Sequence, residues 1–261
     1  LMMWYQALAE AGAGISDTAA GDPYTVAASR LPAANSIMML AAHVSRHRIF
    51  TEWLDPSITD ESQPHLRDAQ LNLYDAANPN QPPYSTDFLE HFAQTQVARN
   101  RRITAWVKEK LAAIRASDSP WSEFAFTVHG TMADPRWLDP SIEPSDRKTG
   151  SCYLGDPQIV NDGPVGLARF CTLRSWLSQW SYDDARCDAI ASGSRISVPV
   201  LVIGNSADDA CTPSHTQRLY NAVTHEQKHL HVVKGATHYY TGANGAEHMA
   251  EACGVIENFL A

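Results

Sequence analysis

Short apolar runs alternate with longer polar or mixed stretches along this chain of 261 residues. Near its end, the run VPVLVIG at 198–204 predicts a buried, β-branched strand, and LHVVKGATH at 230–238 predicts a second strand followed by a turn. A helix over about 213–223, with Pro213 in its first turn, separates the two. Strands that are joined by a single helix are parallel, so their carboxyl ends meet at one edge of the sheet.

The start of the chain continues the same pattern. Segment 1–12 (LMMWYQALAEAG) predicts a helix, and segment 36–43 (SIMMLAAH) predicts a short buried strand. A last helix is expected over about 246–260. Its predicted apolar face, spaced by steps of four and three residues, consists of Met249, Cys253, Ile256 and Leu260.

Residues 45–195 interrupt this alternation of strands and helices. The stretch contains Pro-rich turns, one long helix over about 87–116, and a short apolar run at 124–128 that is either a strand or a buried coil. We therefore expect a mixed α/β chain in three parts. Core segments 1–44 and 196–261 carry parallel strands with flanking helices, and 45–195 is a large, mostly helical cap insertion.

Composition narrows the class of protein. A content of 44% hydrophobic and 19% charged residues is typical of a globular protein. The net charge of −9 argues against a nucleic-acid-binding protein, because phosphate contacts need clustered Lys and Arg. No apolar run approaches the roughly 20 residues that cross a bilayer, so no membrane partner is expected. Five cysteines without C-x-x-C spacing favour reduced thiols and a cytoplasmic location.

Acidic residues and a histidine follow the two C-terminal strands. Asp208 and Asp209 come after the first strand, and His238 comes after the second. An acid and a histidine at the carboxyl ends of neighbouring parallel strands are two of the three groups of a nucleophilic relay. His43, at the end of the predicted N-terminal strand, and Tyr239, next to the histidine, are candidate substrate-binding residues because both positions would face the same site.

These residues resemble part of the α/β-hydrolase fold superfamily. VPVLVIGNSADDACTPSH followed by LHVVKGATH is similar to the last two strands of that family, which carry the acid and the histidine of a catalytic triad. Residues 235–238 match the family's Gly-x-x-His turn. The resemblance implies that Asp208 is the acid and His238 the base. Asp209 is the alternative acid, because the acidic loop is one residue longer than the commonest form.

The third group of that family, a serine in G-x-S-x-G, precedes the acid in the chain. No such motif occurs in this sequence. Ser206 in the nearest match, 204–208, follows a strand, but a loop rather than a helix comes after it. Segment 1–12 resembles the helix that follows the family's serine. The resemblance thus implies the C-terminal part of a cap-bearing hydrolase whose nucleophile lies upstream of Leu1.

Other reactive side chains fit a catalytic or metal-binding role less well than Asp208 and His238. Cys152 and Cys211 are conceivable thiol nucleophiles, but neither follows a strand–turn–helix, which favours buried, unreactive thiols. His229 and His231 would point to the same side of a strand, yet no third ligand with suitable spacing accompanies them. The sequence predicts no metal site, and the resemblance implies no organic cofactor.

The resemblance implies a serine-type hydrolase, with carboxylic esters as the first expectation, that acts through an acyl-enzyme. The substrate would be a small, apolar ester bound under the cap. The 261-residue chain alone, without the serine, would be inactive. Two alternatives stay open: a non-catalytic binding or interaction protein on the same fold, and an acyltransferase or non-ester hydrolase.

Overall fold

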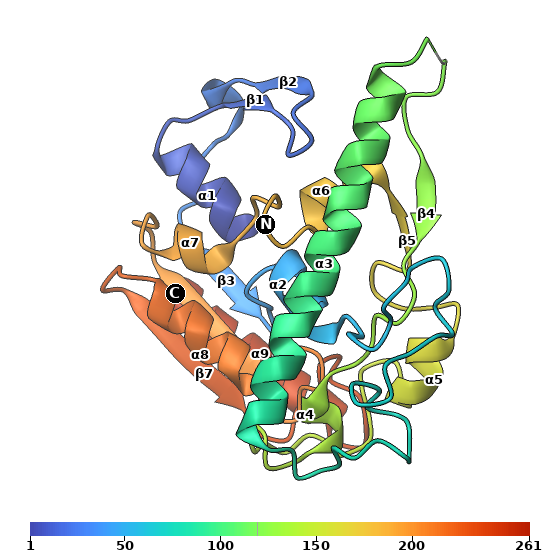
Figure 1. Ribbon diagram of the computed structural model, residues 1–261. Helices are drawn as coiled ribbons and strands as arrows, with labels where there is room; N and C mark the ends of the chain where they lie inside the picture. The colour runs from blue at the N-terminus through green and yellow to red at the C-terminus, as the bar shows by residue number, and fades with distance from the viewer. Residues whose placement is uncertain (119) are drawn as a thin grey trace.

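A three-stranded parallel sheet lies on one side of the computed structural model, which describes residues 1–118 and 120–261 (Figure 1). Its strands, in spatial order, are β3 (Ile37–Leu40), β6 (Val200–Asn205) and β7 (Lys228–Val233). Both strand pairs are parallel, and the central strand β6 is buried along its whole length. The predicted fold class, mixed α/β with parallel strands and flanking helices, is confirmed.

Helices cover both faces of this sheet. On one face lie α1 (Met2–Glu10), α7 (Ala189–Gly193) and α8 (Pro213–Ala222), and on the other lies α9 (Gly245–Leu260). The alternation of side chains along a strand explains the two layers. Val200 and Val202 of β6 point to the first group of helices, whereas Leu201 and Ile203 point to α9.

The predicted cap region holds most of the remaining elements. Its helices are α2 (Arg46–Trp53), α3 (Thr86–Arg115), α4 (Pro135–Leu138), α5 (Pro157–Asp162) and α6 (Leu173–Gln179). An antiparallel pair, β4 (Ala125–Thr127) with β5 (Phe170–Thr172), lies beside them. The long helix α3 starts where the Ser85 hydroxyl accepts a hydrogen bond from the Phe88 N–H. Phe50 and Trp176 pack edge to face in the core beneath it.

Most predicted elements lie within a few residues of their expected ranges, and segment 124–128 contains the strand β4. Not predicted were a small hairpin of β1 (Ile15–Asp17) and β2 (Pro23–Val26) and the 3-10 turn η1 (Ala28–Arg30). The short helices α2, α4, α5, α6 and α7 and the strand β5 were not predicted individually either. No helix in 1–118 or 120–261 is both long and apolar enough to cross a membrane.

The predicted apolar face of α9 is correct only at Ile256. Met249 and Leu260 are 44% and 61% exposed, and Ala252 is buried instead. The side chains that pack with Ala252 on the sheet are Val255, Ile256 and Phe259. This set follows the i, i+3, i+4, i+7 spacing of an apolar helix stripe, and the small Ala252 lets the helix lie close to β6.

Candidate active site

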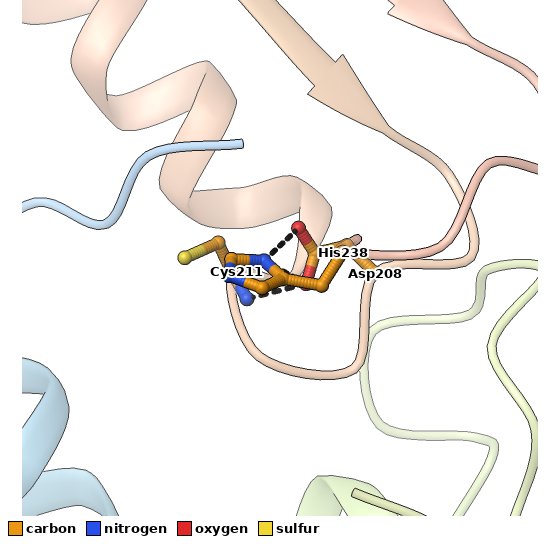
Figure 2. A group of neighbouring side chains, drawn as sticks. All are labelled: Asp208, Cys211 and His238. Atoms are coloured by element: carbon orange, nitrogen blue, oxygen red, sulfur yellow. Dashed lines mark hydrogen bonds and ion pairs between the residues drawn. The ribbon is translucent and has the colours of Figure 1, made fainter. Parts of the chain in front are cut away.

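Two neighbouring loops bring Asp208 and His238 together, although 30 residues separate them in sequence (Figure 2). One loop leaves the end of β6 and the other leaves the end of β7, and the paired residues Asn205 and Val233 start both loops at the same level of the sheet. Nδ1 of His238 lies 2.9 Å from Oδ2 and 3.1 Å from Oδ1 of Asp208. The structure therefore places side by side the two residues that the sequence singles out.

The two loops are also joined to each other through their backbones. The Ala207 N–H donates to the Ala236 carbonyl at 3.0 Å, and the Asn205 side-chain amide donates to the Thr237 carbonyl at 2.8 Å. Gly235 adopts a φ of +77°, a conformation that residues with a Cβ rarely take. The glycine of the Gly-x-x-His turn thus lets the chain reverse directly before the histidine.

The Asp208 carboxylate is completely buried and is oriented by the backbone. Its Oδ1 accepts hydrogen bonds from the N–H groups of Ala210 at 2.8 Å and Cys211 at 2.7 Å. Because a carboxylate only accepts hydrogen bonds, Nδ1 of His238 carries the shared proton. Nε2 is then the basic nitrogen of His238, which is the tautomer that a catalytic base needs.

The environment favours the protonated form of His238. Burial alone would lower the pKa of His238, but the hydrogen bond and the charge of Asp208, together with the charge of Asp209, raise it above its ordinary value of 6.5. An imidazolium that forms when His238 takes up a proton is therefore stabilised at this position.

Asp209 has a different environment from its neighbour. Its carbonyl oxygen accepts the indole N–H of Trp137 at 2.7 Å. Burial, followed by the charge of Asp208, raises the pKa of Asp209 to about 6. Among the hydrogen bonds of the described residues, none joins the Asp209 carboxylate to His238. The geometry brings His238 to Asp208 rather than to Asp209.

A cavity of about 490 Å³ opens beside His238, and both predicted substrate-binding residues, His43 and Tyr239, line it. The Tyr239 ring lies 4.6 Å from the imidazole of His238, measured between ring centroids. Burial, with the charge of His215 next, lowers the pKa of His43 to about 4, so His43 is neutral near pH 7. This second histidine would present an uncharged imidazole to the cavity.

Two aromatic residues of the same cavity, Trp53 and Tyr153, were not among the site residues predicted from the sequence. The Tyr153 ring lies 5.5 Å from that of Trp53 and 6.2 Å from the imidazole of His238, between centroids. Both come from the predicted cap, where no strand pattern indicates which side chains face the loops of Asp208 and His238. In the run GSCYLG the sequence analysis considered Cys152 as a possible nucleophile. The neighbouring Tyr153 is the side chain that flanks His238.

Cys211 is the third reactive group near the pair (Figure 2). One ligand atom each from Asp208, Cys211 and His238 lie within 4.8 Å of one another, and these residue types bind zinc. Both carboxylate oxygens of Asp208, however, already accept hydrogen bonds. Burial and the charge of Asp208 raise the pKa of the Cys211 thiol, which disfavours the thiolate that would bind a metal or act as a nucleophile. The arrangement suits an acid–base pair better than a metal site.

Ser206, in the nearest match to a nucleophile motif, directs its hydroxyl elsewhere. The hydroxyl donates to Oδ2 of Asp146 at 2.6 Å and accepts the N–H of Gly235 at 2.7 Å. Within the described part of the chain no hydrogen bond links it to His238. The Ser206 hydroxyl therefore links segment 134–147 to the loops after β6 and β7.

The histidines of β7 make separate contacts. Nε2 of His231 lies 2.7 Å from a carboxylate oxygen of Glu251 on α9, and the His229 ring packs against Phe259. These contacts hold α9 on the sheet.

Comparison with known proteins finds a similarity among solved structures. No protein-family model matches the chain, and no curated protein matches it. Among solved structures, it is similar to a monoacylglycerol lipase of Paleococcus ferrophilus, with 19% sequence identity and a TM-score of 0.29. The match covers 57% of this chain and 51% of the lipase chain, so it spans about half the length of that protein. No activity is assigned to the chain from this similarity.

Proposed function

We propose that this chain supplies the acid and the base of a serine-type α/β-hydrolase, a carboxylic ester hydrolase in the first instance. The observation that carries the proposal is the contact between His238 and the buried Asp208 at the carboxyl ends of adjacent parallel strands. Nε2 of His238 takes the proton of a serine hydroxyl as the acyl-enzyme forms and returns it to the leaving group. Asp208 holds the imidazole in the required tautomer and stabilises the imidazolium.

Such a relay needs a serine, and we place it in a segment that precedes Leu1 in a longer protein. The support is the position of α1: Leu1, Met2 and Met3 line the same cavity as His238. A residue directly before α1 would lie near the imidazole. The free N–H groups at the start of this helix would favour the negative charge that develops on an ester carbonyl oxygen.

The sheet gives a second line of support. In the described residues β3 pairs with β6 on one side only, and its Met38 and Leu40 are 38% and 39% exposed. Apolar side chains on an unpaired edge strand favour pairing with a further strand. Additional parallel strands beside β3, as the hydrolase fold has, would pair with this edge.

The cavity favours an apolar substrate. Trp53 and Tyr153 from the predicted cap, with Tyr239 and apolar residues of α1, form its walls. Aromatic and aliphatic walls with few polar groups are typical of sites that bind small apolar molecules. We therefore propose a small ester with an apolar acyl group. The relay itself uses only protein side chains.

The test is to obtain the coding sequence upstream of Leu1 and to express the longer protein. The proposal expects a strand followed by Gly-x-Ser-x-Gly directly before Leu1, and hydrolysis of p-nitrophenyl esters. Replacing His238 by Ala should reduce turnover by roughly 10⁴- to 10⁶-fold. An upstream stop codon, an elbow without Ser, Cys or Asp, or near-normal turnover of His238→Ala would contradict it.

A further inference from the structure

Segment 134–147 of the predicted cap contacts both ends of the loop 206–214, which carries Asp208. At one end Asp146 accepts the Ser206 hydroxyl at 2.6 Å and donates its own N–H to the Ser206 carbonyl at 3.0 Å. At the other end Oε2 of Glu143 accepts the Thr212 hydroxyl at 3.1 Å. The loop is thus fixed at its two ends by a segment about 70 residues earlier in the chain.

The middle of the same loop is held by Trp137. Its indole N–H donates to the carbonyl of Asp209 at 2.7 Å, directly after Asp208 in the chain. Trp137 is only 1% exposed, and its ring lies 5.3 Å from that of Trp53. A packed side chain with few alternative rotamers therefore fixes the peptide that follows the catalytic acid.

Glu143 also caps helix α8, which begins where the loop ends. Thr212 is the N-cap residue of α8 but makes no capping hydrogen bond with its own side chain, and Pro213 has no N–H to donate. The backbone N–H and the hydroxyl of Ser214 both donate to the Glu143 carboxylate. A carboxylate at this end of a helix also interacts favourably with the helix dipole.

The backbone of Glu143 is unusual in a way that suits this role. Its φ is +55°, in the left-handed region that residues other than glycine seldom adopt. Such strain persists only where the surroundings fix it, and here the bonds to Thr212 and Ser214 do so. Arg136, 3.7 Å from the Glu143 carboxylate and 3.3 Å from the Thr212 hydroxyl, adds a third contact.

We propose that Glu143 and Trp137 are positioning residues through which segment 134–147 sets the loop 206–214 so that Asp208 reaches His238. Their importance for catalysis rests on the proposed function, but the placement of the acid is a property of this chain alone. Packing of segment 134–147 against the loop 206–214 and formation of the contact between Asp208 and His238 then occur together. If segment 134–147 separated from the loop 206–214, His238 would also lose its contact with Asp208.

The test measures the pKa of His238 in the 261-residue chain by NMR titration of the imidazole protons, with the resonance assigned from a His238→Gln spectrum. Asp208→Asn gives the shift that follows complete loss of the acid. Trp137→Phe removes the indole N–H together with part of the buried ring, and Glu143→Ala removes the capping carboxylate. Trp137→Phe and Glu143→Ala should each lower the pKa of His238 by about 1 unit, since the Asp208 carboxylate no longer lies at its optimal distance from the imidazole. Glu226→Ala, an exposed glutamate beyond the far end of α8, is the matched control and should leave it unchanged.

Thermal unfolding of each variant separates positioning from simple stability. Folded Trp137→Phe and Glu143→Ala proteins that keep the wild-type pKa of His238, even with a lower melting temperature, would overturn the proposal. If Glu143→Ala does not fold, Glu143→Gln, which keeps one acceptor oxygen, and Trp137→Phe decide the question. Lack of ester hydrolysis in the longer protein would contradict the proposed function but would leave this readout intact.

Discussion

Asp208 and Asp209 are consecutive in the chain, yet only the first lies with its carboxylate against His238, at 2.9 Å from Nδ1 in the described structure. Asp209 instead gives its carbonyl to Trp137, and its carboxyl has a pKa raised to about 6. Two neighbouring carboxyl groups with such different surroundings are suited to different chemical roles. The acid of the proposed relay is Asp208.

Exchange of each carboxylate for an amide tests this assignment in the longer protein. Asp208→Asn should reduce kcat/KM for an ester substrate by about 10⁴-fold, because an amide no longer enforces the tautomer with the proton on Nδ1. Asp209→Asn should cost about 10-fold or less, since it removes only a distant charge. Steady-state kinetics on the two purified variants decide the matter, and a larger loss in Asp209→Asn would reverse the assignment.

The pH dependence of the reaction follows from His238. Burial lowers the pKa of His238, but Asp208 raises it by more, so the net value lies above 6.5. The base must be unprotonated in the free enzyme, so kcat/KM should rise with pH through a value above 6.5. In Asp208→Asn the rise of the residual kcat/KM with pH should shift to a lower pH, because the carboxylate that favours the imidazolium is gone. A pH–rate profile with its acidic limb below 6.5 in the wild-type protein would disagree with the geometry.

Asp209 should make the protein less stable as its carboxyl ionises. Its pKa is about 6 in the fold against an ordinary 3.8, first because of burial and then because of the Asp208 charge. A raised folded-state pKa contributes stability below pH 3.8 that is lost as the pH rises through 6. Asp209→Asn, which mimics the neutral acid, should therefore raise the free energy of unfolding at pH 8 but change it little near pH 4. Urea unfolding at the two pH values measures this, and an equal effect at both would show that ionisation is not the cause.

The parallel core and the acid–base pair could be predicted from the sequence because their signals are local. The β-branched run at 198–204 allows little besides a buried strand, and the Gly-x-x-His turn needs a glycine at 235. Since the pairing of parallel strands aligns their carboxyl ends, one of Asp208 and Asp209 was expected near His238, and the structure places Asp208 there.

The contribution of segment 45–195 could not be predicted in the same way. Tyr153, Trp137 and Glu143 reach the loops of Asp208 and His238 from turns and short helices, whose path is set by tertiary packing and not by a periodic pattern. Glu143 supplies the N-terminal capping group of α8 from about 70 residues earlier in the sequence. No local sequence motif predicts a helix-capping residue at such a distance.

The 261-residue chain should not react with a fluorophosphonate probe. The Ser206 hydroxyl is held by Asp146 and Gly235, away from the base that would activate it. The purified chain should stay unlabelled, while the longer protein should label at the proposed upstream serine. Labelling of the short chain that Ser206→Ala abolishes would show that the relay has been assigned to the wrong residues.

The buried ion pairs inside segment 45–195 should matter for stability. Arg136 lies between Asp134 at 2.6 Å and Glu52 at 2.7 Å, and its side chain is only 13% exposed. Arg136→Ala would leave the buried Asp134 carboxylate without its partner, so we expect a loss of about 3–5 kcal/mol in the free energy of unfolding. Arg101→Ala breaks the pair with Asp183, in which both side chains are more than half exposed, and should cost about 1 kcal/mol or less. Urea unfolding followed by circular dichroism compares the two, and equal losses would mean that segment 134–147 is not held by its buried charges.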